Sequence, residues 1–301
     1  MDDNKENIIN LLNKISEYNK KYSGENKAGY YQDKRTIHEL FKSTQDKIDE
    51  SKIRIRLTVL DSMYSTQMRM HPYGSEDLTN AIWEKCYKDN RTGIKDTLIA
   101  IAAGKEPDSR DKADEIYNLF RGKYGVEANN AQAVSLISKY FYFETDYKFP
   151  IYDSIVREYL PILYEYCGNE QRKAIPANDI KQYIETINCF FGIIKYTTDE
   201  LRYDSLDHLL WDVGKIIRGN LSLVLNKGQY EDIMKDKNYK IFEEKIKSNN
   251  YIGDVYEAYI NTFKKVAGKE VLLSDFADIA SAFIEIKLSK KPKSTPEING
   301  D

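Results

Sequence analysis

Apolar residues recur at intervals of three and four along most of the chain, which is the spacing of a buried helix face. In the opening stretch, Ile8, Leu11, Leu12 and Ile15 form such a stripe. The same criterion predicts helices at 5–21, 35–50, 91–103, 110–122, 129–144, 153–167, 177–191, 204–218, 228–247, 251–267 and 273–286, and one that starts at Ser75. We therefore predict a mainly α fold.

One segment carries two patterns. Ile53, Ile55 and Leu57 alternate with polar residues as in a strand, whereas Ile53, Leu57 and Leu60 fit one face of a helix. We predict a helix, because the segment is long and no partner strand is visible nearby.

Polar breaks between these helices suggest how the chain is organised. We predict N-terminal helices at 1–74 that pack with the C-terminal lobe, and a continuous helical lobe at 75–148. A C-terminal helical lobe at 149–287 and a disordered tail at 288–301 would follow. The length of 301 residues suits two domains or one large two-lobed domain.

Composition and charge exclude several classes of protein. A net charge of −3 excludes a uniformly basic nucleic-acid coat, although a local basic groove remains possible. No apolar run is long enough for a membrane helix, and the chain starts without a secretion signal. Cys86, Cys167 and Cys189 stand far apart, which indicates a reduced, cytoplasmic protein without a zinc site or other metal or cofactor.

The segment 131–161 carries the candidate chemistry. Its first helix has two apolar stripes, so it is expected to be buried on most sides. The remaining strip holds Ser135, Ser138, Lys139 and Tyr142, which are three and four residues apart. A polar strip on a buried helix needs a cleft or polar partners. Asp153 follows immediately before the next amphipathic helix.

The stretch Phe149-Pro150-Ile151-Tyr152-Asp153-Ser154-Ile155-Val156 resembles the helix–hairpin–helix superfamily of DNA glycosylases. That superfamily includes endonuclease III, the adenine-specific mismatch glycosylase and 8-oxoguanine glycosylase. Its members have a buried helix, a short loop and a proline-containing stretch before a catalytic aspartate. The resemblance implies a two-lobed all-helical fold, with Asp153 facing the cleft between the lobes and Tyr152 beside the flipped base.

Two further stretches add to the resemblance. Residues 60–67 are similar to a helix that ends in Ser-x-Gln, where the glutamine enters the base stack. This implies that Gln67 is a wedge, with Tyr64 nearby on the DNA side. Residues 206–211 resemble a late helix of bacterial 8-oxoguanine-type relatives, which implies that Trp211 contacts the base. Gln67 is equally compatible with an ordinary polar helix end. A cluster such as Leu209, Leu210 and Trp211 more often belongs to the core than to a base pocket.

The chain also departs from the superfamily. The hairpin sequence Leu-Pro-Gly-Val-Gly is missing before the catalytic helix, and so are the iron–sulfur cysteines of endonuclease III. Asn129 or Asn130 could instead cap this helix, whose first N–H groups could hold a DNA phosphate. Ser135 stands where bifunctional members carry a Schiff-base lysine, so the resemblance implies a monofunctional enzyme.

The chemistry of base removal explains why one carboxylate suffices. Breaking an N-glycosidic bond develops positive charge on the deoxyribose, which a nearby carboxylate such as Asp153 stabilises. The base must first be flipped out of double-stranded DNA. Asp153 could instead be only an N-cap. Lys139 is an alternative nucleophile, because a lysine one turn after Ser135 can reach back toward it, but such lysines more often lie at the surface.

The predicted function is therefore removal of a damaged or modified base by a DNA glycosylase. The base could be oxidised, alkylated, mispaired or a hypermodified base of phage DNA, which would make the protein antiviral. Two other functions stay open. One is a catalytically inactive DNA-binding relative that acts as a sensor or specificity subunit. The other is a helical protein–protein adaptor, which predicts no salt-dependent DNA binding.

Overall fold

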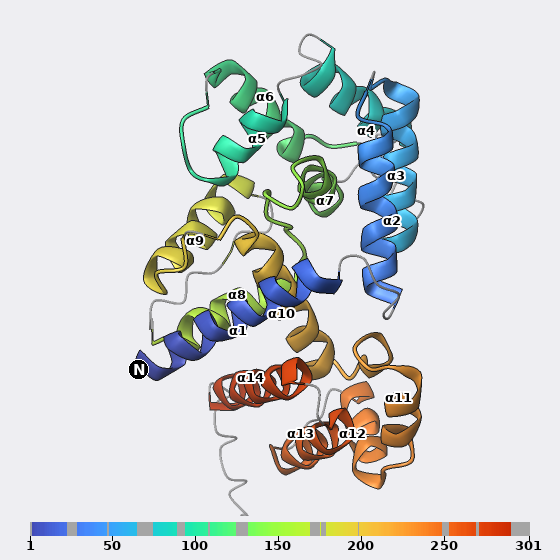
Figure 1. Ribbon diagram of the computed structural model, residues 1–301, viewed down its shortest axis with the longest axis vertical. Coiled ribbons are helices and arrows are strands. Elements are labelled where there is room, and N and C mark those ends of the chain that lie inside the picture. Colours follow the sequence, from blue (N-terminus) through green and yellow to red (C-terminus); the bar gives the residue numbers. More distant parts are fainter. Residues whose placement is uncertain are drawn as a thin grey trace, which may run out of the picture. The chain divides into compact units, whose positions relative to one another are not determined.

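A computed structural model of the protein describes residues 2–22, 29–46, 48–64, 75–88, 94–107, 109–124, 132–168, 175, 179–197, 199–248, 253–268 and 271–289. Within these ranges the protein is all-helical and has no strands (Figure 1). The helices are α1 (Asp2–Tyr22), α2 (Gly29–Ser43), α3 (Glu50–Tyr64), α4 (Ser75–Ile82), α5 (Ile94–Ala102), α6 (Arg110–Arg121), α7 (Val134–Glu144), α8 (Ser154–Tyr166), α9 (Ile180–Ile193), α10 (Arg202–Ile217), α11 (Lys227–Met234), α12 (Lys237–Lys247), α13 (Gly253–Ala267) and α14 (Val271–Ser289).

The mainly α prediction is confirmed, including the helical choice for the ambiguous segment, which is α3. The single helix predicted at 228–247 is wrong. It is two helices, because the Asp236 side chain accepts a hydrogen bond from the Asn238 N–H and caps a new helix, α12. The predicted helix at 35–50 is also misplaced, since α2 begins at Gly29 and ends at Ser43. A π-helical turn at Trp83–Tyr87, which the apolar spacing does not reveal, continues α4.

The chain divides into two compact units. Unit 1 comprises Met1–Pro161 and Lys173–Trp211, and unit 2 comprises Ile162–Arg172 and Asp212–Asp301. This division does not coincide with the predicted boundaries at 74 and 148. The predicted arrangement of two lobes around a cleft stays a prediction.

Helix α7 lies at the centre of unit 1 and contacts α2, α3 and α6 (Figure 1). Nine of its eleven residues are buried, so the expectation of a helix buried on most sides is confirmed. Aromatic rings surround it. Phe41 of α2 packs against Tyr140 and Phe143, and Phe120 of α6 packs against Phe141. The apolar stripes of α7 therefore fix its position, and its polar strip must find partners inside the unit.

A buried arginine holds α2, α3 and α7 together. The guanidinium of Arg56 on α3 lies 2.7 Å from the Glu144 carboxylate, and both side chains are buried. It also donates to the Phe41 carbonyl of α2 at 2.7 Å and to the Thr44 hydroxyl at 2.8 Å. The lost hydration of the Arg56 charge is thus replaced by several hydrogen bonds. This network holds the middle of α3 against α2 and α7.

Unit 2 contains α11 to α14, which follow the last stretch that resembles the glycosylase superfamily, residues 206–211. Its core includes Phe242 and Tyr259, whose rings are stacked with centroids 3.6 Å apart. The Tyr259 hydroxyl donates to the Ile216 carbonyl at 2.6 Å, which ties α13 to the end of α10.

No described helix of either unit is both long enough and apolar enough to cross a membrane. The predicted tail lies, from residue 290 on, outside the described residues.

Candidate functional site

Asp153 stands directly before α8 and uses its two carboxylate oxygens differently. Oδ1 accepts hydrogen bonds from the backbone N–H groups of Ile155 at 2.9 Å and Val156 at 3.1 Å. Oδ2 lies 3.7 Å from Nζ of Lys139, and the side chain is 18% exposed. The capping interaction is therefore present, and it leaves Oδ2 free of the cap and facing Lys139.

Lys139 is not the surface lysine that its type favours, because its side chain is only 7% exposed. Its amino group donates to the Ser135 hydroxyl at 3.1 Å, so it does reach back one helical turn as the spacing predicts. The same amino group lies 5.2 Å from the centre of the Tyr64 ring, a cation–π distance. Four predicted site residues, Ser135, Lys139, Asp153 and Tyr64, thus lie together.

The other polar residues of α7 find partners in unit 1. The Ser138 hydroxyl donates to the Ser135 carbonyl at 2.9 Å and accepts from the Tyr152 N–H at 3.0 Å, which holds the chain just before Asp153 against α7. The Tyr142 hydroxyl donates to the buried carboxylate of Asp204. Tyr152 is buried, and the centre of its ring lies 4.6 Å from the centre of the Tyr183 ring. In the structure Tyr152 therefore packs in the core. A base contact by Tyr152 stays a prediction.

The other predicted site residues are Gln67, Asn129, Asn130 and Trp211. Gln67, Asn129 and Asn130 lie outside the described residues. Trp211 is half-buried in α10, directly after the fully buried Leu210, and its contact with a base stays a prediction. The predicted cap by Asn129 or Asn130 is wrong, because α7 begins at Val134 and its N-cap residue is Ala133, without a side-chain cap hydrogen bond. The glutamine wedge and a phosphate at the start of α7 stay predictions.

Comparison with protein-family models, with curated proteins and with solved structures gives no match for this chain. The site must therefore be interpreted from its own chemistry. Among the described residues, no group of three or more His, Cys, Asp or Glu side chains could hold a metal ion.

Asp207 of α10 is a further acidic residue near the cluster, with no role in the predicted site. It is almost completely buried and lies among Ile151, Tyr183 and Leu206. Burial, followed by the negative charge of Asp153, raises the pKa of Asp207 to about 8. A carboxyl group that keeps its proton near neutral pH beside an ionised carboxylate is a common feature of acid–base sites. Its signal in the sequence is an aspartate inside an apolar helical run.

Proposed function

We propose that the protein is a DNA glycosylase in which Asp153 is the catalytic carboxylate. The proposal rests on the different surroundings of the two carboxylate oxygens of Asp153. Oδ1 is held by two backbone N–H groups, whereas Oδ2 faces Lys139 at 3.7 Å in a partly exposed position. A carboxylate that is fixed in place and still reachable is what stabilisation of a sugar cation requires.

In the proposed reaction the bond between C1′ of the deoxyribose and the base nitrogen breaks, and its electron pair leaves with the base. The negative charge of Asp153 stabilises the positive charge that develops on the sugar. A water oxygen then bonds to C1′ and its proton passes to the departing base nitrogen, which leaves a neutral free base and an intact abasic site. The half-buried ring of Tyr64 could pack against the flipped nucleotide on one side of this position.

We propose that the enzyme is monofunctional. Ser135 cannot form a Schiff base with C1′. The Lys139 amino group is already held between Oδ2 of Asp153 at 3.7 Å and the Ser135 hydroxyl at 3.1 Å. The amino group of Lys139 would instead hold Asp153 and a neighbouring DNA phosphate. Borohydride treatment during turnover tests this point. No trapped adduct is expected, and an adduct that disappears in Lys139→Ala would move the nucleophile to Lys139.

The decisive experiment is base release by Asp153→Asn on a panel of double-stranded DNAs with oxidised, alkylated, mispaired and phage-type hypermodified bases. Asparagine keeps the cap but loses the charge, so we expect base release to fall by about 100-fold or more with DNA binding retained. Asp179→Asn is the matched control, because Asp179 caps α9 through the Gln182 N–H at 3.0 Å. Equal activity of the two variants would refute the assignment.

The same panel separates the other functions. Salt-dependent DNA binding by the wild-type protein without release of any base would favour an inactive DNA-binding relative. Absence of salt-dependent DNA binding would leave the adaptor interpretation.

A further inference from the structure

Asp207 of α10 lies beside the candidate catalytic carboxylate. It lines a narrow space together with Ile151 and Val156. Ile151 stands two residues before Asp153, and the Val156 N–H is one of the two groups that hold Oδ1 of Asp153, at 3.1 Å. The chain on both sides of Asp153 therefore borders the same space as Asp207.

The carboxyl group of Asp207 has no hydrogen bond and no ion pair in the described part of the chain, although the side chain is only 9% exposed. The two tyrosines beside it donate elsewhere, the Tyr183 hydroxyl to the Ile151 carbonyl at 2.6 Å and the Tyr203 hydroxyl to the Ala102 carbonyl at 2.5 Å. Burial raises the pKa of both tyrosines, so neither ionises near neutral pH. A buried carboxyl group without a partner in the protein needs an explanation outside the packing of the core.

The charged groups that act most strongly on Asp207 form two opposed pairs. They are Asp153 with Lys139, and Asp204 with Lys34. Each lysine is turned to its own partner, so neither holds Asp207 as an anion. Burial, followed by the negative charge of Asp153, raises the pKa of Asp207 to about 8. Asp207 therefore keeps its proton at neutral pH and is a hydrogen-bond donor.

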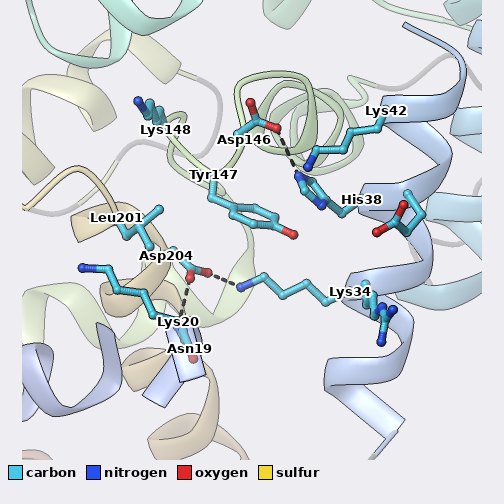
Figure 2. A pocket seen from close by; sticks show the side chains of 12 residues that line it. Asn19, Lys20, Lys34, His38, Lys42, Asp146, Tyr147, Lys148, Leu201 and Asp204 are labelled. Carbon is cyan, nitrogen blue, oxygen red and sulfur yellow. Dashed lines mark hydrogen bonds and ion pairs between the residues drawn. The ribbon is translucent and has the colours of Figure 1, made fainter. Parts of the chain in front are cut away.

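Asp204, one turn earlier on α10, is in the opposite situation. It lies at the floor of a cavity of about 630 Å³ between the end of α1, one face of α2, the turn after α7 and the start of α10 (Figure 2). There it is paired with Lys34 and accepts hydrogen bonds from Asn19 at 2.9 Å and from the Tyr142 hydroxyl. These contacts give Asp204 a structural role, which Asp207 lacks.

We propose that Asp207 is the general acid of base removal, and that the bases removed are neutral rather than cationic. The proposal rests on the proposed glycosylase function and adds a second catalytic residue to it. When the bond between C1′ and the base nitrogen breaks, its electron pair leaves with the base. The hydroxyl proton of Asp207 passes to that nitrogen, directly or through one water, and Asp207 becomes a carboxylate. The proton of the water that attacks C1′ then restores Asp207, so the water proton reaches the base by way of this residue.

The proton on Asp207 indicates the class of substrate. A neutral base takes on negative charge as it leaves, so a proton donor beside it lowers the barrier. A base alkylated on a ring nitrogen, such as 7-methylguanine, already carries a positive charge and leaves as a neutral molecule without any proton. A buried acid that stays protonated assists only the first class. It favours oxidised, mispaired and hypermodified bases over cationic alkylated ones.

The test compares base release by the wild type and by Asp207→Asn on double-stranded DNA. The neutral probes are 8-oxoguanine, mispaired adenine and glucosylated 5-hydroxymethylcytosine, and the cationic probe is 7-methylguanine. On a neutral base that the wild type releases, the variant should be slower by about 100-fold, whereas any release of 7-methylguanine should change by less than about threefold. Asparagine has nearly the shape of the protonated acid, so circular dichroism should show an unchanged fold.

The pH profile provides a second readout that a purely structural residue would not move. On a neutral base, kcat/KM of the wild type should fall about tenfold for each pH unit above about pH 8, because Asp207 loses its proton there. This fall should be absent in Asp207→Asn. Asp179→Asn is the matched control, because Asp179 is exposed and caps α9, and it should keep both the rate and the pH profile of the wild type.

Several results would overturn the role of Asp207 and leave the glycosylase function standing. They are wild-type rates of Asp207→Asn on neutral bases, equal losses on neutral bases and 7-methylguanine, an alkaline fall that persists in the variant, or a wild type that releases 7-methylguanine alone. In each case Asp153→Asn still tests the catalytic carboxylate. Release of no base by the wild type would instead refute the glycosylase function and the role of Asp207 with it.

Discussion

Replacing Asp207 with asparagine should make the protein more stable at neutral pH. The pKa of Asp207 is raised by burial and by Asp153 from its ordinary value of 3.8 to about 8. The folded protein therefore keeps a proton that the unfolded chain has lost above about pH 4. Unfolding releases this proton. The contribution of Asp207 to the free energy of unfolding therefore falls as the pH rises from about 4 to about 8, and it levels off above that pH.

The size of this stability change follows from the difference between the pKa of Asp207 in the folded and the unfolded protein. Each pH unit inside the window changes the free energy of unfolding by about 1.4 kcal/mol, so the step from pH 5 to pH 7 is worth about 2–3 kcal/mol. Asparagine has nearly the shape of the protonated acid and does not titrate. The stability advantage of Asp207→Asn over the wild type should therefore grow by about 2–3 kcal/mol between these two values.

Urea unfolding followed by circular dichroism at several pH values measures this difference directly. Asp204→Asn is the control one turn earlier on α10. Hydrogen bonds and the charge of Lys34 lower the pKa of Asp204 despite its burial, so this variant should lose stability at neutral pH, by about 3–5 kcal/mol, because Lys34 is left without its partner. Parallel pH profiles for the wild type and Asp207→Asn would refute the proposed protonation.

Further substitutions test the packing of each unit. Arg56→Met should lower the free energy of unfolding by about 3–5 kcal/mol, because Glu144 stays buried without its partner, whereas Arg54→Met on the exposed side of α3 should change it by less than about 0.5 kcal/mol. Gly192→Ala should raise stability by about 0.5 kcal/mol, because Gly192 is helical and a Cβ there meets nothing within 4 Å. Gly219→Ala should lower it by about 1–2 kcal/mol, since Gly219 has φ of +73°. Thermal unfolding checks all four.

Local spacing was sufficient to predict most helices and the unusual character of α7. Its two apolar stripes required burial, and its polar strip required partners, which the structure supplies. The break near Asp236 was missed because one cap residue interrupts an otherwise continuous pattern. A cap depends on one side chain, whereas the apolar spacing is repeated over many residues. It is therefore easier to predict that a segment is helical than to predict whether it forms one helix or two.

Long-range contacts explain what the spacing did not reveal. The partner of Tyr142 is Asp204, 62 residues later, and that of Lys34 is the same carboxylate, 170 residues later. The stripe of Lys34, His38 and Lys42 is visible in the sequence, but its cavity exists only because α1, the turn after α7 and α10 close around it. No local pattern contains that information.

The opposite ionisation of Asp204 and Asp207 shows how such contacts decide chemistry. The two carboxyl groups lie three residues apart on one helix and are both buried, so burial alone would raise both pKa values. Asp204 is held as an anion by Lys34, Asn19 and Tyr142. Within the described part of the chain Asp207 forms no ion pair, and Lys139, the nearest cation of the cluster, faces Asp153 instead. The position of two lysines therefore determines that one acid anchors the floor of the cavity while the other holds a proton beside the candidate catalytic carboxylate.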